Sequence, residues 1–169
     1  LQQRFIQQGI TTYTDMIVGL PGETYDSFCN GVSAVIANGQ HHAIKFYNAT
    51  LLPNAEMGNP VYCQRHGIET VKIECHYLHT EVEPPLDGIE EYHEFVIATH
   101  AMPREDWVRC RAFACMTDFL YYGKKLLQFP LVIFTQLTPL SYREFIETFC
   151  EASETYPLLR EIQTFFLNK

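Results

Sequence analysis

The sequence predicts an α/β fold in which parallel βαβ units are followed by a mainly helical region. Ile10–Leu20 is rich in Thr, Tyr, Ile and Val and has the composition of a strand, and Ala43–Leu52 is predicted as a second strand. The stretch between them, Thr24–Asn38, carries apolar residues at three- and four-residue spacing, as a helix does. A helix of this length between two strands predicts a parallel pair joined by a right-handed crossover.

Glycine and proline mark the ends of the other predicted elements. Gly9 ends a helix over Leu1–Gln8, and Gly39 ends the helix over Thr24–Asn38. Ile89–Ala101 is ambiguous between helix and strand. The elements before it are a loop over Pro53–Pro60, a short helix over Val61–His66 ended by Gly67, a strand over Ile68–Leu78 and an acidic linker over Val82–Gly88.

The second half of the chain is predicted to be helical over Arg104–Leu127, Tyr142–Glu154 and Tyr156–Leu167. Pro103 suits the first turn of the first of these helices, and Glu105 suits its positive end. We therefore divide the chain at residue 80, with the βαβ units in residues 1–80 and a mainly helical region in residues 81–169.

The composition favours a globular cytoplasmic protein that binds neither nucleic acid nor membranes. The 169 residues are 47% hydrophobic, and the net charge of −8 disfavours a phosphate-binding surface. The longest apolar run, near Leu126–Leu140, is interrupted by Pro130 and Pro139 and is shorter than the roughly 20 residues of a membrane helix. Six scattered cysteines without a CxxC pair are typical of reduced, mostly buried thiols.

The junction between the first strand and its helix is the most informative segment. Residues 15–24 read Asp-Met-Ile-Val-Gly-Leu-Pro-Gly-Glu-Thr, so a Gly-Leu-Pro-Gly turn follows the carboxyl end of a strand. α/β folds build ligand sites at such ends, and a glycine-rich turn can cradle a phosphate or a cofactor. The segment is neither a Walker A motif nor GxGxxG. From the residues alone, a ligand loop and a plain strand-to-helix turn are equally supported.

The cysteines and their neighbours are better explained by packing than by metal binding. Cys75, Tyr77 and His79 share one face of a predicted strand, but no second pair of ligands is at hand for zinc, so we predict no metal site. Cys110 and Cys115 would lie roughly 140° apart around a helix, which favours core packing over chelation.

Two stretches of the chain resemble the radical S-adenosylmethionine (SAM) enzymes. Residues 15–24 closely resemble their fifth-strand motif, which in many members reads Asp-x-Ile-x-Gly-(Phe/Leu)-Pro-Gly-Glu-Thr. Ile44–Met57 resembles the sixth strand and its loop, although Leu51-Leu52-Pro53-Asn54-Ala55-Glu56-Met57 replaces the usual Leu-x-Pro-Gly-Thr-x-Leu. Glu91–Glu94 and Met102–Trp107 resemble the region after the barrel in cobalamin-associated members of the magnesium-protoporphyrin ester cyclase type. The resemblance implies a partial TIM-type barrel in residues 1–80.

The resemblance also implies that this part of the chain forms one wall of a SAM pocket. In the family, the fifth-strand motif supports and contacts the adenine side of SAM, and the sixth strand and its loop line the same pocket. Glu23 would fix the turn or the start of the helix, because a carboxylate is favourable at a helix N-terminus. Carried over by position, the residues near the cofactor would be Ile17, Gly19, Leu20 and Pro21 on one side, and Tyr47, Asn48, Leu52 and Pro53 on the other.

One departure from the family limits this interpretation. The family's chemistry requires a CxxxCxxC motif for a 4Fe–4S cluster, which reduces SAM to a 5′-deoxyadenosyl radical, and cluster binding needs several converging thiolates. No three of the six cysteines have that spacing. We therefore expect the C-terminal part of a radical SAM oxidoreductase, with the cluster and cobalamin sites upstream of Leu1. By itself, such a fragment would bind no cluster and turn over no SAM.

Two other interpretations stay open. The aromatic helical region could form a non-catalytic interaction module or a homo-oligomer, because a barrel cut in half exposes strand edges and apolar faces. A hydrolase that uses the histidines His41, His42, His76 and His79 is a weaker alternative, since His41 and His42 have the position of turn residues. The sequence assigns no substrate.

Overall fold

The first half of the chain forms the predicted βαβ unit. The computed structural model describes residues 2–74, 91–123, 125–151 and 155–167. After the short helix α1 (Gln2–Gln7) come strand β1 (Thr14–Val18), helix α2 (Tyr25–Ala37) and strand β2 (Ile44–Asn48). The two strands pair in parallel, from Thr14 opposite Ile44 to Val18 opposite Asn48, as expected. β1 is shorter than predicted, and it begins at Thr14.

Local hydrogen bonds fix the start of α2. The Thr24 side chain accepts a hydrogen bond from the Ser27 backbone N–H, and the Ser27 hydroxyl accepts one from the Thr24 N–H. This reciprocal capping box satisfies two amide groups that no turn of the helix can satisfy. Gly39, at a φ of +101°, follows the end of the helix and lets the chain reverse toward β2.

The predicted strand over Ala43–Leu52 is divided between two sheets. Ala49 interrupts it: its N–H donates to the Val18 carbonyl oxygen, and its own carbonyl accepts from the Val96 N–H. Beyond it, strand β3 (Thr50–Leu51) joins an antiparallel sheet of order β3-β5-β4. Composition alone could not show this division, because residues on both sides of Ala49 favour strands equally well.

The antiparallel sheet resolves the ambiguous segment as strand β5 (Tyr92–Ala98). Its partner β4 (Glu69–Glu74) covers the first part of the predicted strand over Ile68–Leu78. A 3₁₀ turn, η1 (Glu56–Gly58), and helix α3 (Pro60–His66) connect β3 to β4. The acidic linker, the Cys75–His79 segment and the proposed boundary at residue 80 lie outside the described residues.

The described part of the second half contains one α-helix more than predicted. Helix α4 (Arg104–Thr117) continues into a π-helical segment, η2 (Asp118–Gly123), and is followed by α5 (Gln128–Leu137), α6 (Tyr142–Glu151) and α7 (Pro157–Leu167). α5 was not predicted because Pro130 and Pro139 interrupt the apolar run, although Pro130 lies in the first turn, where proline is tolerated, and Pro139 lies beyond the helix end. Pro103 precedes α4 as its N-cap residue instead of lying in its first turn.

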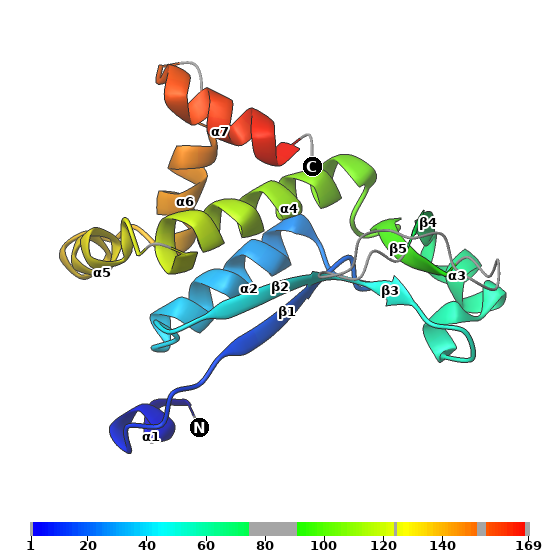
Figure 1. The fold of residues 1–169 in the computed structure, drawn as a ribbon, viewed down its shortest axis with the longest axis horizontal. Coiled ribbons are helices and arrows are strands. Elements are labelled where there is room, and N and C mark those ends of the chain that lie inside the picture. Colours follow the sequence, from blue (N-terminus) through cyan, green and yellow to red (C-terminus); the bar gives the residue numbers. More distant parts are fainter. Residues whose placement is uncertain (1, 75–90, 124, 152–154, 168–169) are drawn as a thin grey trace.

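Helices α2 and α4 cover the same face of the β1–β2 pair (Figure 1). Val18 and Ile44 are fully buried on that face, and the ring of Phe28 from α2 lies 6.2 Å from that of Phe46. The core extends into α4, η2 and α6 through Phe113, Tyr121 and Ile146. The mixed α/β class is thus confirmed, whereas a single pair of parallel strands does not establish a barrel, so the partial barrel stays a prediction.

A charged cluster on the outside of the core ties α6 to α2. The Arg143 guanidinium bonds Asp26 at 2.6 Å and Glu147 at 2.9 Å, and the Tyr25 hydroxyl donates to the same Glu147 carboxylate. The guanidinium of Arg109 lies 3.8 Å from the centre of the Tyr25 ring. Because these groups come from three helices, the cluster fixes their relative positions as well as adding hydrogen bonds. None of the helices in the described ranges is both long and apolar enough to cross a membrane.

We expect replacement of Gly67 by alanine to destabilise the chain. Gly67 ends α3 at a φ of +58°, and an added Cβ would overlap the His100 imidazole. The strain of alanine in a left-handed backbone conformation and the displacement of the His100 ring should together lower the free energy of unfolding by about 1 to 3 kcal/mol. Urea denaturation measures this change.

Gly22→Ala is the matched control, since Gly22 also has a positive φ but has open space around its Cα. An equal loss of stability in the two variants would show that the contact with His100 contributes nothing.

Candidate functional site

One face of the β1–β2 pair is left uncovered by the residues that the structure describes, and it carries two of the predicted cofactor residues. Met16 and Val18 face the helices, so the alternation along β1 turns Ile17 to the opposite side. Along β2 the same alternation exposes Tyr47. Ile17 and Tyr47 are register partners, with 41% and 54% of their surfaces exposed. The fold therefore places an aliphatic and an aromatic side chain next to each other on an open sheet face.

The Gly19–Gly22 turn follows immediately at the carboxyl end of β1. The Glu23 N–H donates to the Leu20 carbonyl oxygen at 3.1 Å, and Gly22 has a φ of +88°. Proline followed by a left-handed glycine is the pattern of a type II turn, in which only glycine adopts the third position without strain. Gly19, at a φ of +92°, likewise needs glycine. The turn presents its main chain and the half-exposed Leu20 side chain beside the uncovered face.

Glu23 does not cap α2, because Thr24 occupies the N-cap position. Its side chain is half-buried, and burial raises the pKa of this carboxyl group. Cys110 lies on the same inner side: a hydrogen bond with Cys29, together with burial, raises the pKa of its thiol. The Glu23 carboxyl group is thus partly buried next to the turn, and the Cys29 and Cys110 thiols belong to the core.

The remaining predicted residues lie farther along the chain. Asn48 ends β2 and is half-buried, and its carbonyl oxygen accepts a hydrogen bond from the Thr50 hydroxyl. Leu52 and Pro53 follow β3 and are exposed. The structure thus brings Ile17, Tyr47 and the turn to one sheet end, whereas Leu52 and Pro53 extend from the antiparallel sheet.

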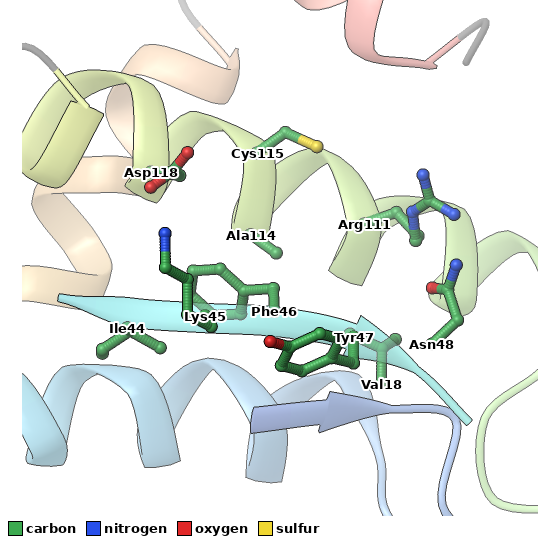
Figure 2. Close-up of a pocket in the computed structure, with 10 residues that line it drawn as sticks. All are labelled: Val18, Ile44, Lys45, Phe46, Tyr47, Asn48, Arg111, Ala114, Cys115 and Asp118. Carbon is green, nitrogen blue, oxygen red and sulfur yellow. The ribbon is translucent and has the colours of Figure 1, made fainter. Parts of the chain in front are cut away.

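A cleft of about 270 Å³ separates the free edge of β2 from α4 (Figure 2). Its floor is apolar, and its rim is polar: the charged Lys45 and Asp118 lie toward one end, and the charged Arg111 and the neutral Asn48 lie toward the other (Figure 2). Sequence reasoning missed the contribution of α4 to this region. The signal was available, because helical spacing places residues 111, 115 and 118 on one face. The full lining is Val18, Ile44, Lys45, Phe46, Tyr47, Asn48, Arg111, Ala114, Cys115 and Asp118.

The two cysteines of α4 face different surroundings, as their helical spacing predicts. Cys110 is fully buried against Cys29, whereas Cys115 lines the cleft. Within the described ranges, no three His, Cys, Asp or Glu side chains come together as a metal site. Cys75 and His79 fall outside those ranges.

The two neighbouring histidines just before β2 lie in the turn that leads into that strand. Nδ1 of His41 lies 2.7 Å from the hydroxyl of the buried Tyr121, and the His41 carbonyl oxygen accepts from the Gln128 side chain. The His42 N–H bonds the side chain of Gln40, and its ring is exposed. His41 therefore helps to join this turn to η2 and α5, which agrees with the expected turn position.

The fold and its site define a βαβ unit with a glycine-rich turn at the carboxyl end of its first strand, the end at which α/β folds place ligands. No family model matches the chain. Over 123 residues it is 36% identical to the cobalamin-dependent radical SAM methyltransferase TokK of Streptomyces tokunonensis. It is also 36% identical over 123 residues to the 2-(S-pantetheinyl)-carbapenam-3-carboxylate methyltransferase of Streptantibioticus cattleyicolor.

Each alignment covers 73% of this chain and 18% of the relative, so the matched part spans less than a fifth of those enzymes. The similarity confirms the resemblance to the radical SAM superfamily, and TokK is by name a cobalamin-dependent member.

We expect His41 to make the chain less stable in mild acid. Partial burial lowers its pKa below the ordinary value near 6.5, so the unfolded chain takes up this proton before the folded chain does. Stability should fall as the pH drops below about 6.5, until the folded-state pKa is passed. Unfolding free energies of wild type and His41→Gln, measured from about pH 7.5 to 5.5, test this, and the variant should lose less.

His42→Gln is the control, because His42 lies in the same turn but bonds Gln40 through its backbone N–H, whereas the His41 ring contacts the Tyr121 hydroxyl. If the unfolding free energies of wild type and His41→Gln fell equally over this pH range, His41 would not be the group that causes the loss of stability.

Proposed function

We propose that the chain forms one wall of the SAM pocket of a cobalamin-associated radical SAM methyltransferase. The observation that carries this proposal is the pairing of Ile17 with Tyr47 on an uncovered sheet face, next to the Gly19–Gly22 turn. The names of the two similar proteins support the class of enzyme. Hydrogen abstraction or methyl transfer would take place on a substrate whose identity the site does not specify.

The side chains and main chain at this face suit an adenosine moiety. An exposed tyrosine ring and an aliphatic neighbour offer a flat apolar surface on which a base can stack. Gly19 and Gly22 expose the main chain of the turn without a Cβ, so amide and carbonyl groups can approach a ligand closely. In this proposal Ile17 and Tyr47 orient the base, and Leu20 and Pro21 exclude water from its edge.

The cysteines do not suit a 4Fe–4S cluster. None of them has CxxxCxxC spacing, and the buried Cys29 and Cys110 contact each other inside the helical core. The cluster and cobalamin would therefore be held by residues outside these 169, in the same longer protein. The residues here would contribute binding and orientation of SAM.

A second proposal, an interaction or oligomerisation module, is favoured by exposed apolar side chains on the last helices. Phe129 and Leu137 of α5 are 74% and 78% exposed. A shallow hollow on α7 and η2 is lined by Phe119, Ile162 and Phe165, among others. Apolar surface of this kind favours association with another protein or with a second copy. Light scattering of the chain as a function of concentration tests this proposal.

Removing the Tyr47 ring should weaken SAM binding without unfolding the chain. In equilibrium dialysis with the 169-residue chain, we expect Tyr47→Ala to bind SAM about tenfold more weakly, the effect of losing one stacked base contact. Its free energy of unfolding should change by less than about 0.5 kcal/mol, because the ring is half-exposed.

Tyr13→Ala is the matched control, since Tyr13 is an exposed tyrosine that precedes β1 at the opposite end of the strand. Equal SAM affinity of Tyr47→Ala and Tyr13→Ala would remove Tyr47 from the site.

Anaerobic reconstitution with iron and sulfide should leave the chain without a cluster. The thiols lack the spacing that a cluster requires, so the optical spectrum should match that of a sample treated without iron. A stoichiometric 4Fe–4S spectrum from these residues alone would refute the proposed division of roles.

A further inference from the structure

The only tryptophan of the chain lies against the Gly19–Gly22 turn. Trp107 belongs to the first turn of α4, far from Gly19 in the sequence. A methyl group added to Gly19 would lie 3.5 Å from both Cδ1 and Nε1 of the indole, and 3.5 Å from Val96. The first residue of the turn is therefore backed by the nitrogen-bearing edge of the indole ring.

The indole nitrogen of Trp107 is buried without an acceptor. Among the residues that the structure describes, it is the one buried side-chain nitrogen or oxygen that has no hydrogen-bond partner. Buried donors are almost always paired, because an unpaired one has lost its bonds to water and gained nothing. Such an atom calls for an explanation, and its position behind a glycine of the turn suggests one.

Arg111, also on α4, places its guanidinium over the Trp107 ring. The Arg111 guanidinium lies 5.3 Å from the centre of the Trp107 ring, one helical turn along. Arg111 also lines the cleft beside Asn48 (Figure 2). The ring is thus in contact with the turn at its edge and with a charged residue of the cleft near its face.

We propose that Trp107 is a positioning residue for the Gly19–Gly22 turn. The ring limits how far Gly19 can move away from the ligand. When SAM is bound, the indole N–H donates a hydrogen bond to a main-chain carbonyl oxygen of the turn. Glycines at φ +92° and +88° give the turn the freedom to rotate a carbonyl group toward the indole. This inference rests on the proposed SAM site.

The variant Trp107→Phe separates this role from a purely structural one. Phenylalanine keeps an aromatic ring but removes the donor, which in the ligand-free chain bonds nothing in the described structure. We expect the unfolding midpoint of Trp107→Phe in urea to equal or exceed that of wild type, while SAM affinity in equilibrium dialysis falls about threefold to tenfold. If the Trp107 ring only filled the core, Trp107→Phe would lower both the unfolding midpoint and the SAM affinity, or it would change neither.

Met116→Leu is the control on the same helix. Met116 is buried in the core about 13 Å farther along α4, and the substitution nearly conserves volume. This variant should bind SAM as wild type does. Equal SAM affinity of wild type and Trp107→Phe would overturn the proposal.

A direct signature comes from the proton on the indole nitrogen. Because the chain has one tryptophan, its NMR spectrum contains one indole N–H resonance. Addition of SAM should move this resonance downfield and slow its exchange with deuterium, as expected of a proton that enters a hydrogen bond. An unchanged shift and exchange rate at saturating SAM would overturn the proposal.

A ligand-free measurement keeps the inference separate from the proposed function. If the wild-type chain binds no SAM in dialysis, the proposed SAM wall fails for this chain. The positioning role is then judged by deuterium exchange of the Gly19 and Gly22 amides. Trp107→Leu should speed their exchange relative to wild type and Met116→Leu, and equal rates would overturn it.

Discussion

The structure depends on the burial of one face of a two-stranded parallel sheet beneath α2 and α4. Val18 and Ile44 are almost without exposed surface there, and Phe28 of α2 reaches the ring of Phe46. Two strands alone are marginally stable in water, so these helices stabilise the pair. Because side chains alternate along a strand, the same burial turns Ile17 and its partner to the open side. The buried core and the exposed candidate site therefore both follow from the alternation of side chains along these two strands.

The switch at Ala49 determines what lies beyond that site. Its N–H continues the parallel pairing, and its carbonyl oxygen begins the antiparallel sheet. The antiparallel sheet returns the chain to α4, so a helix that begins about eighty residues after the Gly19–Gly22 turn packs behind it. This arrangement explains how Trp107 and Arg111 come to the carboxyl ends of β1 and β2, where α/β folds place ligands.

Local signals in the sequence predicted most of the elements, and long-range contacts supplied the rest. Thr24 and Gly67 mark helix ends through interactions with their own neighbours, so their roles could be predicted. The break at Ala49 depends on partners 31 and 47 residues away, and no local pattern records it. In the site, the Gly19–Gly22 turn and Tyr47 were predicted from the resemblance, whereas Trp107 was not. We single it out because its buried indole nitrogen has no hydrogen-bond partner in the described part of the chain, and only the packing reveals this.

The central claim is that the uncovered face of β1 and β2 receives the adenosine part of SAM. The most direct measurement is a set of intermolecular nuclear Overhauser effects between SAM and the isotope-labelled 169-residue chain. Binding at this face predicts contacts from the adenine protons to the Ile17 methyl groups and the Tyr47 ring. Contacts confined to the far side of the β2 edge, near Ala114 and Cys115, would contradict it, because the nucleoside would then occupy the cleft beside α4.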